Sequence, residues 1–275
     1  MKQTKRKYQI RIIGLLLFLI IANTYVFTRH RTEKGTLNKE TLIVGMELKF
    51  PPFETIDEKG TPMGVSVELA HKLGEKLGKN IEIRSLDWAG LIPALQTQNI
   101  DLIISSMSIT EERLATIDFS NEYASSDLAL AIHKEAAAKS YEDLNHPEVT
   151  VAVKQGTIGE MWAMTHLPQA QIKSFTEVSA GLLDVNSGQS TAFIYDPLSL
   201  IESSKNLSQI KLNLDALPGT KGWGIGMRKG EAALQEAINR ALVEIQAEGF
   251  YEEMREKYLK EEVEKYESYG LKYFF

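Results

Sequence analysis

Apolar runs alternate with polar stretches along the chain, and this pattern predicts repeated strand and helix units. Leu69, Leu73 and Leu77 are spaced by four and give one helix an apolar face. Ser66 stands just before this face and is expected to cap the helix. Strand, helix and strand in succession indicate βαβ units and a parallel sheet. The buried strands expected in this first part are 41–44, 81–83 and 101–104.

The same pattern begins again after a polar connection at residues 133–148. A second set of short apolar runs predicts strands at 149–153, 172–175 and 192–195, with helices at 158–165 and 177–185 between them. Because parallel strands end at one edge of a sheet, the residues that follow each strand should gather in one crevice.

Polar groups with binding chemistry stand at these strand ends. Arg113, shortly after the strand at 101–104, offers a planar fork of donors that suits a carboxylate. Gln155-Gly156-Thr157 leads into a helix, and amides at a helix N-terminus bind anions. Asp196 has two open interpretations, a helix cap before Pro197 or an anion that faces the crevice. In the proline-rich loop, Phe53 is expected to pack, whereas Phe50 could pack or contact a ligand.

The amino terminus carries a basic segment followed by an apolar run at 12–22. This layout is typical of a secretory signal, and with residues 25–27 it approaches the length needed to span a bilayer. Small residues are poorly placed for cleavage, so an uncleaved anchor is favoured over a cleaved signal. The chain has no cysteine, which excludes disulfides and attachment of a lipid to a cysteine.

The charge of the chain argues against nucleic acid as a partner, and its motifs argue against a metal site and a phosphate-binding loop. Beyond residue 35 the chain holds 23 basic and 36 acidic residues, because 8 of 31 Lys and Arg and 1 of 37 Asp and Glu precede that point. Such an acidic body argues against nucleic-acid binding. The five histidines show no metal-ligand spacing, so no metal or other cofactor is expected. The glycine-rich stretch 218–230 lacks a phosphate-loop pattern and is expected to cross between lobes.

These residues together resemble the bacterial extracellular solute-binding proteins of family 3, which serve ABC importers of polar amino acids. The resemblance covers about residues 40–259. Its most specific part is Ser105 to Arg113 with the following Ile117-Asp118-Phe119-Ser120. Shorter matches are Pro52-Phe53-Glu54, Trp88 to Leu95, Gln155-Gly156-Thr157 and Tyr195-Asp196-Pro197.

The resemblance implies an α/β, two-lobed periplasmic-binding-protein type II fold. Each lobe has a mostly parallel sheet flanked by helices, and two crossover strands join the lobes. The implied division is lobe one at 38–122 plus 225–259 and lobe two at 129–218. Outside the resemblance, residues 1–35 are expected to form a signal or anchor segment with linker, and residues 260–275 are expected to form a docked tail.

The resemblance also implies roles in binding an amino acid. Arg113 would pair with the α-carboxylate, helped by Thr157 and the amide of Ile158, and Asp196 would bind the α-ammonium. Ser106 and Ser108 would add carbonyl and hydroxyl groups. Two departures from the family pattern are Ser66, where an aspartate is common, and Ile158, where a hydroxyl is common. The implied ligand-binding residues are Glu47, Phe50, Trp88, Ser106, Ser108, Arg113, Thr157, Ile158 and Asp196.

The expected function is an extracytoplasmic receptor that binds a polar amino acid and delivers it to an ABC permease. Glu47 at the side-chain end favours a cationic ligand such as arginine or lysine, although an amide could also bond it. The protein is expected to be a monomer, tethered to the membrane by its N-terminal segment, and not an enzyme. The alternatives are a sensor with the same core and a dehydratase-like enzyme that would use Glu47 as its acid.

Overall fold

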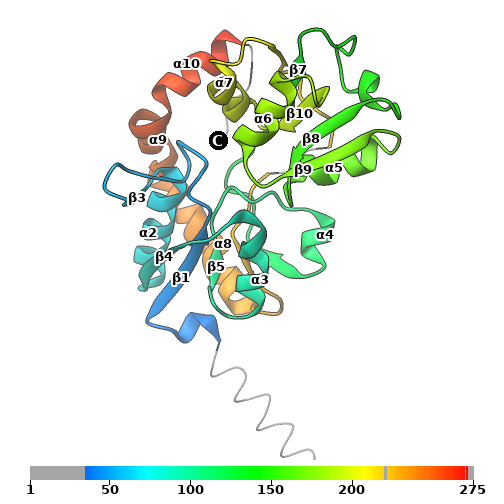
Figure 1. Ribbon diagram of the computed structural model, residues 1–275. Coiled ribbons are helices and arrows are strands. Elements are labelled where there is room, and N and C mark those ends of the chain that lie inside the picture. Colours follow the sequence, from blue (N-terminus) through cyan, green and yellow to red (C-terminus); the bar gives the residue numbers. More distant parts are fainter. Residues whose placement is uncertain (1–34, 220–221, 270, 272–275) are drawn as a thin grey trace, which may run out of the picture. The chain divides into compact units, whose positions relative to one another are not determined.

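The computed structural model describes residues 35–219, 222–269 and 271 (Figure 1). The expected signal or anchor segment therefore lies almost wholly outside the described residues. Within them, no helix combines the length and the apolar character needed to cross a membrane. The chain divides into residues 1–40, whose described part contains one 3-10 turn at Thr36–Asn38, and a compact unit formed by residues 41–275.

The compact unit contains a first sheet of five strands, in the order β4-β1-β5-β12-β6. β1 pairs in parallel with β4 and β5, whereas β12 pairs antiparallel with β5 and β6. The expected strands at 41–44, 81–83 and 101–104 are thus neighbours in one sheet. The strand bounds are β1 Thr41–Met46, β4 Asn80–Ser85, β5 Leu102–Ile103, β6 Ile117–Phe119 and β12 Gly226–Arg228.

Helices with one apolar stripe cover this sheet. In α2 the leucines Leu69 and Leu73 are fully buried, as their spacing predicts, and the helix packs against α8. The expected cap at Ser66 is wrong, because α2 begins at Val65 and Gly64 holds the cap position with φ 116°. Only glycine adopts this conformation easily. The helices that belong with the first sheet are α2 Val65–Leu77, α3 Leu91–Gln96, α4 Glu111–Leu114 and α8 Ala232–Ala247.

A second five-stranded sheet has the order β11-β7-β10-β8-β9. Its centre, β10-β8-β9, is parallel, and β7 pairs antiparallel with β10 and β11. Trp162 and Phe193 belong to two separate apolar clusters that are built on the strands of this sheet. The bounds are β7 Ala129–His133, β8 Thr150–Lys154, β9 Gln171–Phe175, β10 Ala192–Tyr195 and β11 Ile210–Asn213, with α5 Ile158–His166, α6 Val178–Asn186 and α7 Pro197–Ser204.

Two chain segments connect the sheets and run beside each other. The amide of Trp223 donates to the carbonyl of Ala124 at 2.7 Å, and that of Tyr123 donates to Trp223 at 2.9 Å. A short hairpin of β2 Thr55–Ile56 and β3 Pro62–Met63 lies between β1 and α2 in the sequence. The exact lobe boundaries inferred from the sequence stay a prediction.

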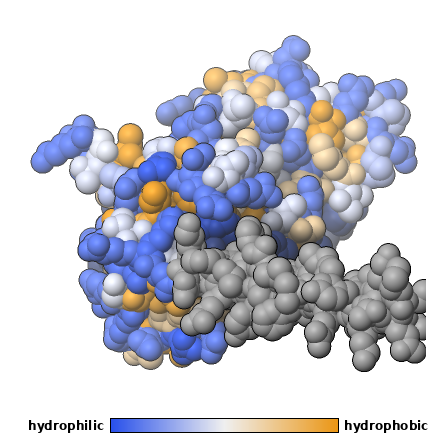
Figure 2. Space-filling view, turned by 90° about the horizontal axis from the view of Figure 1, so that it is seen from below, coloured by the Kyte–Doolittle hydropathy of each residue, from blue (hydrophilic) through white to orange (hydrophobic). Residues whose placement is uncertain are grey.

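The chain after α8 continues as helix. α9 Phe250–Met254 and a π-helical turn at Arg255–Leu259 lead into α10 Lys260–Ser268. Val263 and Tyr266 of α10 are buried, and Lys265 binds Glu202 of α7 at 2.8 Å. In Figure 1 the red α10 accordingly lies beside α7 of the second sheet. The face of the molecule seen in Figure 2 is mostly hydrophilic where it is not grey, with small separate apolar patches.

A buried ion pair joins three strands of the first sheet. Asp101 is fully buried, and its carboxylate accepts from the amide of Ile43 at 3.1 Å and from Arg228 at 3.2 Å. Arg228 also donates to the carbonyl of Ile100 at 2.9 Å. The start of β5 is thereby tied to β1 and β12.

We expect Arg228→Met to lower the free energy of unfolding by about 3 kcal/mol, because it leaves the Asp101 carboxylate buried without its cation. Lys229→Met is the matched control, since Lys229 pairs with Asp118 at an exposed site and such pairs contribute about 1 kcal/mol or less. Urea unfolding of the two variants measures both values. Equal losses would contradict the role given to the buried pair.

Candidate functional site

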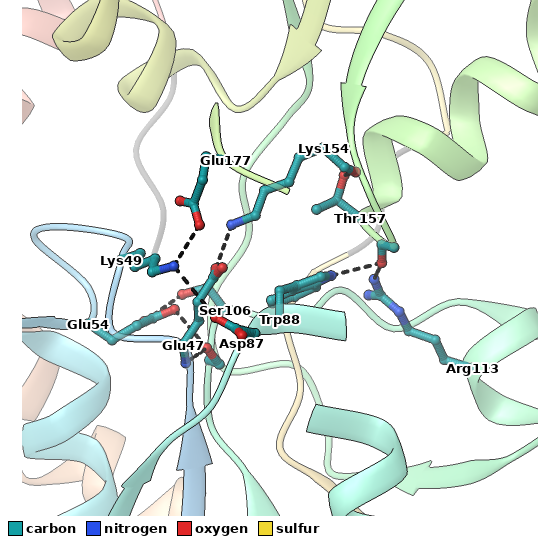
Figure 3. A network of polar contacts seen from close by, with 12 residues as sticks. Glu47, Lys49, Glu54, Asp87, Trp88, Ser106, Arg113, Lys154, Thr157 and Glu177 are labelled. Carbon is teal, nitrogen blue, oxygen red and sulfur yellow. Dashed lines mark hydrogen bonds and ion pairs between the residues drawn. The ribbon is translucent and has the colours of Figure 1, made fainter. Parts of the chain in front are cut away.

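A pocket lies where strand ends of both sheets meet. The loops that follow β1, β5, β8 and β10 contribute to its walls, as the parallel arrangement predicts. Figure 3 shows Glu47, Ser106 and Thr157 from three of these loops. The structure brings all nine candidate residues to its lining: Glu47, Phe50, Trp88, Ser106, Ser108, Arg113, Thr157, Ile158 and Asp196.

Arg113 places a buried guanidinium in this pocket. Its side chain extends from the short helix α4, whose first turn is capped by Thr110, and the residue is 3% exposed. Two of its five N–H groups donate to the carbonyls of Ser108 at 2.6 Å and Gly156 at 3.0 Å. Desolvation lowers its pKa to about 10, so it stays a cation at neutral pH. It forms no salt bridge with the described residues, and its remaining donors can serve a carboxylate.

Asp196 combines the two roles that the sequence left open. One carboxyl oxygen caps α7 by accepting from the amide of Ser199 at 2.9 Å. The other oxygen, Oδ2, is buried and has no hydrogen-bond partner among the described residues. Burial raises the pKa of Asp196 to about 6. A buried acceptor without a partner costs free energy, and a ligand ammonium would satisfy it.

The serine loop after β5 is held by Glu54, which sequence analysis did not single out as a site residue. The hydroxyls of Ser66 and Ser106 hydrogen-bond one oxygen of Glu54 at 2.6 and 2.9 Å, and Ser105 reaches the other at 3.3 Å. Ser106 has φ 50°, a conformation that is uncommon for a residue with a side chain. Its hydroxyl donates to Glu54 and is therefore not a free donor for a ligand.

Desolvation raises the pKa of Glu54 to about 8, so this carboxyl is mostly protonated at neutral pH. The sequence offered one signal for Glu54, because Pro52-Phe53-Glu54 is one of the short segments that resemble the family. The reason for its burial was not visible, because the serines that surround it come from distant parts of the chain. These contacts also explain why Ser66 does not cap α2.

Glu47 is paired with a lysine that sequence analysis missed. Lys154, the last residue of β8, binds Glu47 at 2.5 Å, and both residues are almost completely buried. The Lys154 ammonium lies 5.9 Å from the ring centres of Trp88 and Tyr195. The only sequence signal was a lysine that ends an otherwise aliphatic strand. The carboxylate expected to meet a ligand side chain thus already has a cation beside it.

The turn before α5 meets residues of the first sheet. The carbonyl of Gly156 accepts both from Arg113 and from the indole of Trp88, the latter at 2.9 Å. The Thr157 hydroxyl donates to the carbonyl of Lys154 at 2.7 Å, so it is not a free donor. The amide of Ile158, at the first position of α5, has no partner within the helix and remains suited to an anion.

Aromatic rings form the rest of the wall. Phe50 stacks on Phe53 at 5.2 Å and meets Tyr195 and Trp223 edge-on at 6.4 and 5.8 Å. Phe53 is buried and does not line the pocket, so packing describes it, whereas Phe50 both packs and lines the pocket. On the exposed rim, Lys49 bridges Asp87 and Glu177 at 3.6 and 2.7 Å.

The arrangement favours reversible binding of a small zwitterion. It offers a fixed cation, a buried anion with one oxygen unused, a helix N-terminus and an aromatic wall. Within residues 35–219, 222–269 and 271, no group of three or more His, Asp or Glu side chains is arranged to hold a metal ion. A pocket of this composition holds a small polar molecule by charge complementarity and stacking.

The chain matches known proteins over nearly all of its described length. The model of the bacterial extracellular solute-binding proteins, family 3, matches residues 42–261. The chain is 26% identical to the L-cystine-binding protein TcyJ of Escherichia coli over 260 residues, which cover 92% of this chain and 96% of the relative.

Two solved structures extend the likeness to the fold. An ancestral arginine-binding protein bound to arginine is 34% identical, with a TM-score of 0.72 over 80% of this chain and 98% of its own. A substrate-binding protein of an amino acid ABC transporter is 28% identical, with a TM-score of 0.70 over 80% and 99%. The predicted two-lobed α/β fold is thereby confirmed. With the family model matched over 220 consecutive residues, the chain belongs to the bacterial extracellular solute-binding proteins, family 3.

Proposed function

We propose that this pocket binds a free polar amino acid through its α-carboxylate and α-ammonium groups. The observation that carries the proposal is the unpartnered Oδ2 of Asp196 in a pocket that also holds the buried guanidinium of Arg113. A zwitterion supplies the cation that Asp196 lacks and the anion that Arg113 lacks. Few other small molecules carry an ammonium and a carboxylate on the same carbon atom.

In this proposal Arg113 pairs with the carboxylate and the amide of Ile158 adds a second donor. Asp196 accepts from the ammonium, with backbone carbonyls of the serine loop at Ser106 or Ser108 beside it. Phe50 and Trp88 enclose the aliphatic part of the side chain. Thr157 positions the turn before α5, because its hydroxyl is bonded to the backbone.

The far end of the side chain would meet Glu47. Taken by itself, this carboxylate would favour arginine or lysine, and the relatives named for arginine and for cystine both bind polar amino acids. Lys154 beside Glu47 adds a second charge at this position. The proposed ligand class is therefore a polar amino acid, with arginine, lysine, glutamine and cystine as the ligands to compare first.

The proposed role is that of a receptor that delivers its ligand to an ABC permease outside the cytoplasm. The family description and the similar substrate-binding protein of an amino acid ABC transporter support this role. We further propose that the protein acts as a monomer tethered through residues 1–35. A dehydratase-like activity is not favoured, because Glu47, the acid considered for it, is held in an ion pair, and the named relatives are binding proteins.

Arg113→Ala should weaken amino acid binding by about 2–5 kcal/mol, roughly thirty- to several-thousand-fold, because the ligand carboxylate loses its buried cation. Isothermal titration with the twenty amino acids and cystine measures this loss. Arg84→Ala is the control, since Arg84 is exposed on β4 and pairs with Glu82. A loss of less than about threefold for Arg113→Ala would refute the carboxylate assignment.

Affinity should fall about tenfold as the pH is lowered from 7 to 5, because Asp196 has a pKa of about 6 and must be ionised to bind the ammonium. Protonation of Asp196 removes the acceptor charge, so the loss occurs on the acid side of this pKa. Glu54, with a pKa of about 8, stays protonated throughout this range and does not contribute.

Titrations of the wild type and of Asp196→Asn at several pH values separate this cause from others. The Asn variant should bind more weakly at pH 7 and show almost no further loss at pH 5. If the variant keeps the full tenfold dependence, another group is responsible.

A further inference from the structure

The pair formed by Glu47 and Lys154 is a charged feature of the pocket that the α-groups of an amino acid do not use. Glu47 follows β1 of the first sheet, and Lys154 ends β8 of the second sheet. Glu47 is 6% exposed and Lys154 is 2% exposed. Their charged atoms lie 2.5 Å apart. Neither residue contacts Arg113 or Asp196 through a hydrogen bond among the described residues.

Glu47 lines the pocket directly, whereas Lys154 is not one of the lining residues. Figure 3 shows the ammonium of Lys154 above Glu47, on the side of Trp88 away from Arg113. The Arg113 guanidinium lies 5.5 Å and the Lys154 ammonium 5.9 Å from the Trp88 ring centre. The Trp88 ring, which lines the part of the pocket proposed for the ligand side chain, therefore has a cation on each side.

This geometry changes what Glu47 offers to a ligand. An unpaired buried carboxylate would attract a cationic side chain strongly, because few water molecules screen the charges. With Lys154 bonded to it, the carboxylate is already neutralised, and a second cation at the same place would also be repelled by the ammonium. An uncharged polar side chain of the same shape can still hydrogen-bond the Glu47 carboxylate, and the Lys154 ammonium does not repel it.

We propose that Lys154 is a specificity-determining residue that acts through Glu47. Its ammonium lowers the preference of the pocket for cationic side chains relative to uncharged polar side chains of the same shape, such as a terminal urea or carboxamide. This inference rests on the proposed function, in which Arg113 and Asp196 hold the α-groups and leave the side chain to reach Glu47.

Arginine and citrulline test the proposal because they share one shape and differ in the charge of the side-chain terminus. Isothermal titration of the full chain with both ligands gives their affinity ratio. In Lys154→Met the buried carboxylate of Glu47 has no cation, so the arginine-to-citrulline ratio should rise at least tenfold over that of the wild type. Lys173→Met, on the exposed face of the neighbouring β9, should leave the ratio unchanged.

A purely structural role of the ion pair would predict a different result. If the pair only joined the two sheets, Lys154→Met would weaken both ligands equally and keep their ratio within about threefold, which would overturn the proposal. The double variant Lys154→Met/Glu47→Gln removes both charges, and its ratio should return close to that of the wild type. A double variant that keeps the raised ratio would show that Glu47 does not mediate the effect.

Stability gives a second readout, since Lys154→Met leaves a buried charge uncompensated. Saturating arginine should raise the Tm of this variant more than that of the wild type, whereas citrulline should not. If Lys154→Met fails to fold, Lys154→Gln keeps the length of a polar side chain and tests the same ratio.

The outcomes for the two proposals are separable. Loss of arginine and citrulline binding in Arg113→Ala, together with an unchanged ratio in the Lys154 variants, would reject only the role of Lys154. Absence of binding of any amino acid to the wild type would reject the proposed function and the role of Lys154 together.

Discussion

Charged groups that are buried where two sheets meet must be compensated, and this requirement organises the pocket. Each group is compensated differently. Arg113 donates to two backbone carbonyls and lies over the indole of Trp88, and Lys154 and Glu47 neutralise each other. Glu54 remains protonated among hydroxyl groups. Of these pocket groups, only Asp196 keeps a buried oxygen without a partner among the described residues, and in this respect the pocket is incomplete without a ligand.

The order of elements could be predicted from the sequence because it depends on local patterns. Mainly apolar runs of four or five residues gave the strands β1, β8 and β10 to within about two residues, and fourfold spacing gave the buried face of α2. The start of α2 could not be predicted in the same way. Ser66 has the chemistry of a cap, but Glu54, which lies twelve residues earlier, binds its hydroxyl. A distant carboxyl thus replaced a local interaction.

The site was predictable where a residue type and its place at a strand end pointed to the same role. Arg113 and Asp196 belong to this class, and both line the pocket. Lys154 was not predictable, because its partner Glu47 lies 107 positions away and the strand around it is aliphatic. Glu54 was hidden for a related reason, since its pKa depends on burial, which no local pattern specifies. Charge compensation across the two sheets is a property of the folded chain.

The C-terminal helix has a mechanical consequence. Two neighbouring segments near Ala124 and Trp223 connect the sheets, so they form a natural axis for rotation of one sheet against the other. α10 makes a third connection, because it continues from the helices that follow α8 and binds α7 through Lys265 and Glu202. A hinge with a third attachment has fewer degrees of freedom than one with two. Rotation of one sheet against the other would therefore either carry α10 along with α7 or separate Lys265 from Glu202.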